Sequence, residues 1–226
     1  MLGRKIGMSQ VYGDDGVIVP VTVIEAGPCV VLQVRTQDRD GYDAVQLGFG
    51  DIPREKAPRS VRGHVAFLGG RRQDALRSAG VAASPRAECE PKRFVREFRL
   101  QDASHGYSVG QVLQADSLGG VQWVDVIGVS RGRGTSGVMR RHGFAGQPGS
   151  HGAKRVHRHG GSIGQSADPS RVLRGTKMPG RFGNDRVTVR NLRLVRVDVG
   201  SNLLLVRGAV PGPAGAYVVI RRSEKN

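Results

Sequence analysis

Residues 128–183 combine many basic and glycine residues with few apolar ones, and the apolar ones follow no period. The segment contains 11 of the chain's 35 Lys and Arg residues but only one acidic residue, Asp168. It also contains 14 of the 34 glycines and four of the six histidines. A segment of this kind cannot bury enough apolar surface to offset the entropy that it loses on ordering. An ordered working state therefore requires a polyanionic partner, which indicates a nucleic acid.

We call residues 128–183 the basic arm, and its cations and histidines are the candidate RNA-binding residues. Cations contact phosphates, and imidazole rings stack on bases or hydrogen-bond to phosphate oxygens. The candidates are Arg131, Arg133, Arg140, Arg141, His142, His151, Lys154, Arg155, His157, Arg158, His159, Arg171, Arg174, Lys177 and Arg181. The arm also has single apolar residues, which are Ile163, Leu173, Met178 and Phe182. We expect them to fix one conformation against a shaped surface, which folded RNA offers better than duplex DNA does.

The rest of the chain has a near-ordinary charge balance and enough apolar residues for a core. With 226 residues and a net charge of +16, the chain has room for one large domain or for a domain with a satellite. It has no run of about 18 apolar residues that could span a membrane, and residues 1–10 lack the apolar stretch of a secretory signal. Cys29 and Cys89 are two thiols in a large chain, which indicates a reducing compartment. We therefore expect a cytoplasmic protein.

Outside the basic arm the sequence predicts short strands separated by tight turns. Residues 17–24 are rich in β-branched side chains, and the turn sequences at residues 14–16 and 26–28 flank them. The expected strands are residues 4–12, 17–25, 29–36, 42–49, 94–100, 111–115, 121–129, 186–197, 202–210 and 216–221. Short strands at this spacing are typical of a barrel or a sandwich rather than of βαβ units.

We predict a mainly β protein whose body is an antiparallel β-barrel. The body is expected to comprise residues 1–50, 94–127 and 184–226. Residues 51–93 are expected to form an inserted α-containing subdomain, with a short helix at residues 71–79 that ends at Gly80. The basic arm is an excursion from the barrel, because strand signals occur on both sides of it. The alternative architecture is two sandwiched domains joined by a linker.

Gly132 to Gly137 match the pattern G-x-G-x-x-G of dinucleotide-binding loops and follow a predicted strand. No amphipathic helix is expected to follow, because Gly143, Gly146 and Pro148 interrupt the next residues. No acidic residue occurs about 20 residues later to bind a ribose. Glycine backbone N–H groups can instead approach phosphates closely, and we assign this role to the phosphates of a polymer.

The remaining polar residues of the arm do not form a catalytic or metal-binding pattern. Zinc sites need three or four ligands at compact spacing, and no Cys follows Cys89. Ser150 and His151 lack an acidic residue to orient the imidazole, since Asp168 is the arm's single carboxylate. We therefore expect no enzyme, no cofactor, no metal ion and no small-molecule substrate. Two other classes remain open: a nucleotide-dependent enzyme that uses Gly132–Gly137, and a non-specific DNA-binding architectural protein.

Several segments resemble, in the same order, the bacterial form of the universal large-subunit ribosomal protein three. They are GRKIGM at residues 3–8, PVTVIE at 20–25, DGY at 40–42, VDVIGVSRGRG at 124–134, GSIGQ at 161–165, RVTV at 186–189 and NLLLVRGAVPG at 202–212. The resemblance covers nearly the whole chain and implies a barrel of the elongation-factor type. It implies a structural role in the large subunit, with a long extension that enters ribosomal RNA near the peptidyl-transferase region. It also implies a part in early assembly and contacts with neighbouring ribosomal proteins.

The chain departs from this family's pattern within the arm. Where the family usually has Trp and Asn after a basic pair, this chain has His142 and Gly143 after Arg140 and Arg141. Gly160 stands where Pro is usual, and residues 62–93 are longer than in the family and only loosely matched. Some members carry a methylated glutamine at the position of Gln165, so the resemblance makes Gln165 a candidate for methylation.

The glycine-rich residues 143–150 predict a bend at the far end of the arm. Residues 131–142 and 151–181 flank this bend as two basic stretches, and both must return to the body. A hairpin-like excursion would then put residues 140–147 farthest from the body and deepest in the RNA. Extended chain spans about 3.3–3.6 Å per residue, so the excursion could reach tens of ångströms.

Overall fold

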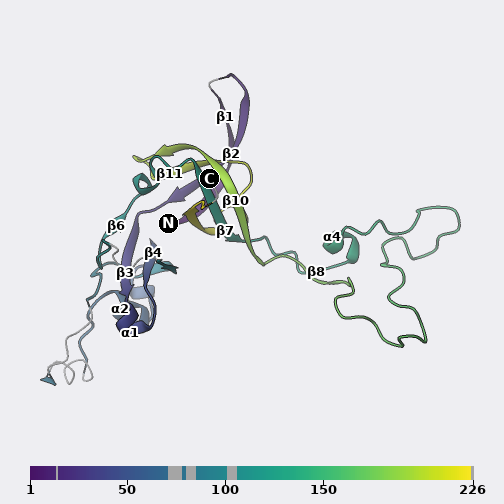
Figure 1. The fold of residues 1–226 in the computed structure, drawn as a ribbon, viewed down its shortest axis with the longest axis horizontal. Coiled ribbons are helices and arrows are strands. Elements are labelled where there is room, and N and C mark those ends of the chain that lie inside the picture. Colours follow the sequence, from purple (N-terminus) through teal and green to yellow (C-terminus); the bar gives the residue numbers. More distant parts are fainter. Residues whose placement is uncertain (14, 71–77, 80–84, 101–105, 225–226) are drawn as a thin grey trace. The chain divides into compact units, whose positions relative to one another are not determined.

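The computed structural model describes residues 1–13, 15–70, 78–79, 85–100 and 106–224. The protein is mainly β, as predicted. Its contacts divide the chain into two compact units, which can be followed by colour in Figure 1. The first unit comprises Met1–Gly128 and Val187–Asn226, and the second comprises Val129–Arg186. No helix among the described residues is long and apolar enough to cross a lipid bilayer.

Six strands of the first unit form one antiparallel sheet. They are β1 (Leu2–Tyr12), β2 (Ile18–Ala26), β7 (Trp123–Val129), β10 (Arg186–Asp198), β11 (Leu203–Arg207) and β12 (Tyr217–Arg222), and each overlaps a predicted strand. Their order is β1-β12-β7-β10-β11-β2, and β2 also pairs with β1. Residues 17–25 and 186–197 therefore belong to the same sheet and not to two separate domains.

The core of this sheet follows the two-residue period of its strands. Val124 and Val126 on β7, and Val218 and Ile220 on β12, are fully buried and occupy every second position of their strands. They pack in one cluster with Leu204 and with other buried residues of β2 and β11. Successive side chains of a strand point to opposite faces, so this alternation directs one face of every strand inward. Burying these aliphatic side chains supplies the main stabilisation of the first unit.

A second sheet of the first unit has the order β5-β4-β3-β6. Its strands are β3 (Cys29–Arg35), β4 (Ala44–Asp51), β5 (Lys92–Arg99) and β6 (Val112–Leu113). Cys29 and Val31 of β3 pack in one core cluster, whereas Val30 and Leu32 pack in another, so β3 is buried on both faces. The assignment of residues 29–50 and 94–100 to the same sheet as β1 and β2 is wrong. Strand propensity identifies strands but does not determine their partners.

The helices that the structure describes in the first unit are short and lie between the strands. They are α1 (Gln37–Asp40), α2 (Arg59–Val65) and the 3-10 helices η1 (Arg54–Lys56) and η2 (Ala115–Leu118). α2 contributes Val65 to the cluster that covers one face of β3. The helix predicted at residues 71–79, with its end at Gly80, falls almost entirely outside the described residues.

The second unit has little regular structure. It contains two short strands and one helix, which are β8 (Thr135–Ser136), β9 (Gly180–Arg181) and α4 (Val138–His142) (Figure 1). Between Val129 and Arg186 only Ser136 and Val138 are buried. This unit therefore lacks a hydrophobic core of the kind that stabilises the first.

A buried carboxylate connects three strands of the six-stranded sheet. Asp125 of β7 is 3% exposed, and its Oδ1 accepts a hydrogen bond of 3.0 Å from the backbone N–H of Asn191 on β10. Its Oδ2 accepts bonds of 3.2 and 3.0 Å from the guanidinium of Arg221 on β12. Burial alone would raise the pKa of Asp125, but the Asn191 N–H and the Arg221 guanidinium outweigh burial and lower that pKa below 3.8.

Replacing Leu204 with Ala should lower the free energy of unfolding of the first unit by about 2–5 kcal/mol, because this side chain is fully buried in the core. The matched control is Leu173→Ala in the second unit, where the side chain is 56% exposed and we expect a change within about 0.5 kcal/mol. Urea unfolding followed by the fluorescence of Trp123, the single Trp, measures both. Equal losses in the two variants would contradict the assigned core.

Asp125 should make stability depend on acid pH. A carboxyl group whose pKa is lowered by folding contributes stability above its unfolded pKa of about 3.9, and this contribution disappears as the pH falls through the folded value. The difference in unfolding free energy between the wild type and Asp125→Asn should thus be constant between about pH 5 and pH 7 and shrink below about pH 4. Urea titrations at stepped pH test this expectation, and a difference that persists unchanged to pH 3 would refute it.

Candidate RNA interface

The basic arm begins and ends in a two-stranded ribbon. The N–H of Arg133 donates to Phe182 O and the N–H of Phe182 donates to Gly134 O, each at 2.9 Å. Closer to the ends of the unit, the N–H of Asn184 donates to Ser130 O at 3.2 Å. The guanidinium of Arg133 lies 5.5 Å from the centroid of the Phe182 ring, a cation–π contact.

Position 183 of this ribbon requires a glycine. Its φ is +74°, a conformation that L side chains rarely adopt. A Cβ at this position would overlap the carbonyl oxygen of Arg131 in the opposite strand. The glycine thus allows the two strands to approach closely, and this approach gives Arg131, Arg133 and Arg181 fixed places on one ribbon.

Three arginines line a concavity beside the ribbon. Arg131, Gly132, Arg133 and Arg140 surround a cavity of about 260 Å³. All three arginines are exposed, and guanidinium groups bind phosphate oxygens with two parallel hydrogen bonds. This part of the G-x-G-x-x-G pattern therefore has the composition of an anion site.

The geometry around Gly132–Gly137 does not support the nucleotide-binding alternative. A dinucleotide loop needs a strand followed directly by a long helix whose N-terminus binds the pyrophosphate. Here the segment continues into the two-residue strand β8 and then into α4, which has only five residues. The described residues also contain no group of three or more His, Cys, Asp or Glu side chains that could hold a metal ion.

α4 contacts the returning segment just before β9 through the side chains of Arg141 and His142. Arg141 donates from its guanidinium to Met178 O at 2.7 Å, and Nε2 of His142 donates to the same oxygen at 3.1 Å. These two side chains are half-buried as a result, whereas Arg140 is exposed. The His142 and Phe144 rings have centroids 6.2 Å apart. His142 thus orders the arm as well as offering an aromatic surface.

The loop after α4 turns back earlier than the sequence predicts. The N–H of Gln147 donates to His157 O at 3.0 Å, and Nδ1 of His157 donates to Pro148 O at 2.8 Å. Residues 148–156 therefore form a closed loop of their own, and residues 161–175 form another. The bend at residues 143–150 is not the tip of a simple hairpin between residues 131–142 and 151–181. The glycine content indicated a turn, but it could not indicate which carbonyl groups would accept the hydrogen bonds that close the loop.

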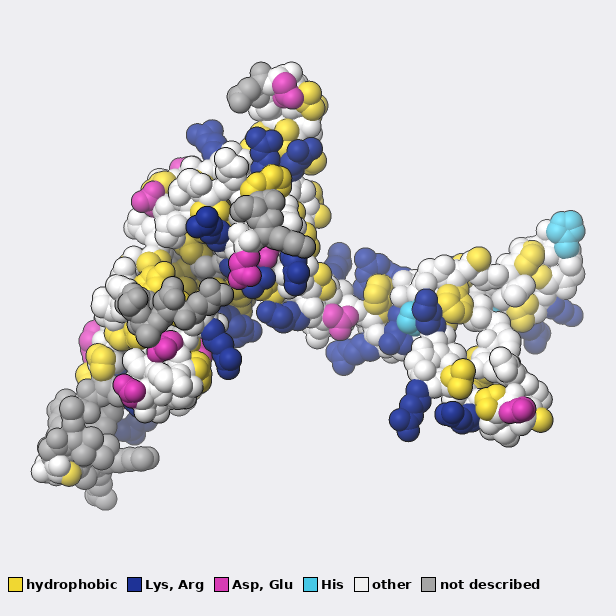
Figure 2. All heavy atoms as spheres, viewed as in Figure 1, with side chains coloured by type: hydrophobic (Ala, Val, Ile, Leu, Met, Phe, Trp, Pro, Cys, Tyr) yellow, Lys and Arg dark blue, Asp and Glu magenta, His cyan; other side chains and the backbone are white. Residues whose placement is uncertain are grey.

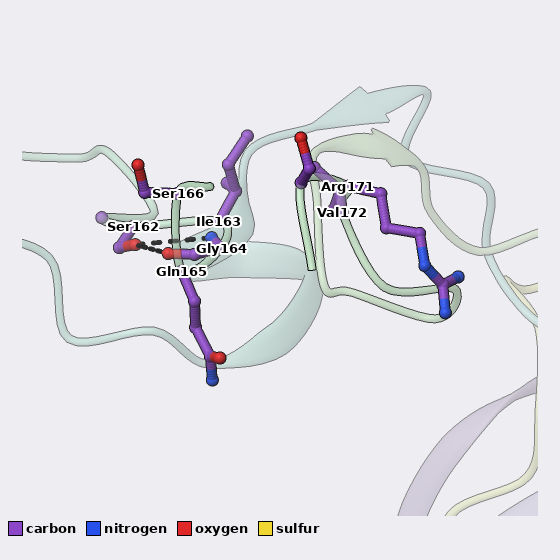
Figure 3. A pocket seen from close by; sticks show the side chains of 9 residues that line it. Ser162, Ile163, Gly164, Gln165, Ser166, Arg171 and Val172 are labelled. Atoms are coloured by element: carbon purple, nitrogen blue, oxygen red, sulfur yellow. Dashed lines mark hydrogen bonds between the residues drawn. The ribbon is translucent and has the colours of Figure 1, made fainter. Parts of the chain in front are cut away.

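The motif at residues 161–165 forms a compact turn. The hydroxyl of Ser162 donates to Gly164 O at 3.0 Å and accepts from the Gly164 N–H at 3.4 Å. The turn lines a cavity of about 510 Å³ together with residues 165–166 and 170–172. In Figure 3 the Gln165 side chain extends away from this turn and Arg171 lies on the opposite side of the cavity. The cavity is formed largely by backbone and small side chains, which lets a ligand approach the main chain.

The single apolar residues of the arm do not pack into a protein core. Ile163 is 55% exposed, Leu173 is 56% exposed and Met178 is 36% exposed, whereas Phe182 is half-buried. Their exposure agrees with the expectation that they need an external surface, because nothing within the unit buries them.

The candidate cations are free to meet an external polyanion. Thirteen of the fifteen candidate RNA-binding residues are exposed, and the other two, Arg141 and His142, are half-buried. No ion pair with a carboxylate occurs for any arm cation within the described residues. Figure 2 shows dark blue side chains along this unit and few magenta ones.

Sequence reasoning missed a set of cations on β10, which it assigned only to a strand. Arg190, Arg193 and Arg196 of this strand are exposed in the first unit. The signal was present as basic residues spaced three apart in a strand otherwise rich in aliphatic residues. They extend the candidate basic surface beyond the arm.

Comparison with known proteins gives the family. Residues 101–203 match the family described as Ribosomal protein L3. The chain is 54% identical over 225 residues to the large ribosomal subunit protein uL3 of Rhodopirellula baltica, covering 100% of this chain and 97% of the relative. It is 48% identical to uL3 of Corynebacterium jeikeium, with 100% and 94% covered, and 47% identical to uL3 of Heliobacterium modesticaldum, with 100% and 97% covered. Because these similarities extend over the whole chain, the protein belongs to the uL3 family of large ribosomal subunit proteins.

Proposed function

We propose that this protein is a non-enzymatic structural constituent of the large ribosomal subunit that binds large-subunit rRNA through its basic arm. The observation that carries the proposal is the combination of exposed, carboxylate-free cations with an arm that buries only two of its own residues. The arm has the charge to neutralise a polyanion and lacks a core that would order it alone. Membership of the uL3 family supports the same function.

The arm's chemistry favours folded RNA over duplex DNA. Contacts of Arg and Lys to phosphates supply affinity and position, but they do not distinguish sequences. The exposed apolar residues Ile163, Leu173 and Met178 suit unstacked bases and cavities, which a regular duplex does not present. The arm cavities beside Arg131 and beside Ser162 can receive phosphate or sugar groups close to the backbone.

We propose that the first unit is the body that supports the arm, with the six-stranded sheet as a closed barrel of the elongation-factor type. The pairing of β2 with both β11 and β1 supports closure, because the strand order then returns to its start. The segment at residues 51–93, which contains η1 and α2, is a subdomain inserted between β4 and β5. The exposed arginines of β10 would add rRNA contacts on the body.

The family relation places further expectations on this chain. We propose a cytoplasmic protein that joins the subunit early, contacts neighbouring ribosomal proteins, and brings its arm near the peptidyl-transferase region. Gln165 is the proposed methylation site, and its exposed side chain extends away from the local turn (Figure 3), which leaves its amide accessible. The proposal includes no cofactor and no metal ion.

Salt dependence tests the proposal. If half of the arm's 11 cations meet phosphates, the affinity for large-subunit rRNA should fall by roughly a thousandfold between 50 and 200 mM salt, because bound cations release counterions. Deleting residues 131–182 should remove most of this steepness. The deletion joins chain ends that are already adjacent, since Ser130 and Asn184 hydrogen-bond to each other. Filter binding of full-length and deleted protein measures both slopes.

Three outcomes would contradict the proposed function. An unchanged salt slope after the deletion would assign the electrostatics to the body, and equal affinity for duplex DNA and folded rRNA at matched salt would favour a DNA-binding protein. Saturable stabilisation by a nucleotide without rRNA binding would favour the enzyme alternative. Urea unfolding of the deleted protein provides the control that the first unit still folds.

A pair of glycines in one loop tests whether the arm's conformation matters for binding. Gly146 has a φ of +78°, and a Cβ there would overlap His157 O, so Gly146→Ala should strain the loop by about 1–3 kcal/mol. We expect a roughly five- to hundredfold loss of rRNA affinity. Gly149→Ala is the matched control, because a Cβ there meets nothing within 4 Å, and its affinity should stay within about twofold. Equal affinities would show that the arm binds only as a flexible polycation.

A further inference from the structure

The β1–β2 hairpin extends beyond the sheet that holds its base. Among the described residues, β12 pairs with β1 only at residues 2–4, and β11 pairs with β2 only at residues 21–25. Gly208, just after β11, donates its backbone N–H to Pro20 O at 3.0 Å. Farther out, Val11 pairs with Val19 and Tyr12 with Ile18, with no third strand of the described residues beside them. We call residues 6–20 the outer ribbon. A two-stranded ribbon is at best marginally stable in water unless another surface covers it.

One face of the outer ribbon is apolar and exposed. Residues paired across two antiparallel strands point to the same face, so Met8, Tyr12 and Ile18 share one face. Their side chains are 56%, 74% and 51% exposed. On the opposite face Val11 and Val19 are half-buried, whereas Ser9 is exposed. A cluster of large exposed apolar side chains on one face is typical of a binding surface.

The outer ribbon itself has no cation for a phosphate-rich partner, and the exposed Arg207 of β11 pairs with Val21 only at its base. Residues 6–34 contain no Lys, Arg or His, in a chain whose net charge is +16, and their charged residues are Asp14, Asp15 and Glu25. The two cations that precede the ribbon are engaged. Arg4 forms an ion pair of 2.8 Å with Glu25, and Nζ of Lys5 donates to Val210 O at 2.8 Å and to Gly212 O at 3.1 Å.

We propose that the apolar face of the outer ribbon docks against a neighbouring protein of the ribosomal particle. The proposal rests on the proposed function, because the particle supplies the partner. The partner's contact surface would be apolar at its centre, to cover Met8, Tyr12 and Ile18. It would carry Lys or Arg at its edge, to face the exposed Asp15 between β1 and β2. Figure 2 shows yellow and magenta side chains at the outer end of the hairpin that Figure 1 labels β1 and β2.

Cross-linking in assembled subunits tests the proposed partner class. The photoreactive residue p-benzoylphenylalanine replaces Tyr12 in the full-length chain, and in a matched control it replaces Ser9, which is exposed on the opposite face of the same ribbon. After subunits are purified and irradiated, the Tyr12 position should link to a different ribosomal protein, at least tenfold more efficiently than the Ser9 position does. Cross-links mainly to rRNA, links to a second copy of this chain, or equal yields from the two positions would overturn the proposal.

A triple variant separates this inference from the proposed function. Met8→Ser, Tyr12→Ser and Ile18→Ser together should leave rRNA affinity and its salt slope within about twofold of the wild type, because the ribbon carries no cation. The same variant should lower the occupancy of the cross-linked protein in purified subunits at least fivefold. The control triple Val112→Ser, Val195→Ser and Val199→Ser removes exposed apolar side chains elsewhere in the first unit and should not change that occupancy. Unchanged occupancy in the ribbon variant would refute the docking surface. Failure of the wild-type protein to bind rRNA would instead refute the proposed function.

Discussion

The second unit depends on the balance between the entropy of ordering a chain and the apolar surface that this chain can bury. From Val129 to Arg186 only Ser136 and Val138 are buried, so backbone hydrogen bonds and glycine conformations supply most of its internal order. Such contacts offset little of the roughly 1–2 kcal/mol that each ordered residue costs. The remaining stabilisation must come from outside the chain, and the unit's exposed cations determine that it comes from a polyanion.

In the first unit, buried side chains of the unit itself offset the entropy cost of ordering the chain. Aliphatic residues at alternate positions of β7, β11 and β12 make a continuous core, and the buried carboxylate of Asp125 is satisfied by Asn191 and Arg221. The difference between the units is visible in one comparison: Leu204 is fully buried, and Leu173 is more than half exposed. The first unit can therefore fold on its own contacts, while the second is built for assembly.

Much of this organisation could be predicted from the sequence, because composition and period-two patterns report burial directly. Residues 17–24 predicted β2, and the lack of acidic residues identified the arm. Strand partners could not be predicted in the same way. The uninterrupted apolar run from Cys29 to Leu32 is typical of a strand buried on both faces, and that signal separates β3 from the strands of the six-stranded sheet. The contacts of Gly146 and Gly183 could not be predicted at all, because they depend on carbonyl groups brought close only by the folded chain.

The place of the arm between β7 and β10 has a consequence for synthesis of the chain. β12 pairs with both β1 and β7, yet it follows the arm in the sequence, as do β10 and β11. During translation the hairpin of β1 and β2 can form early, but the six-stranded sheet cannot be completed until the whole arm has left the ribosome that makes it. Each nascent molecule thus exposes its basic segment before its own hydrophobic core is closed, and nearby nucleic acid can compete with folding during that interval.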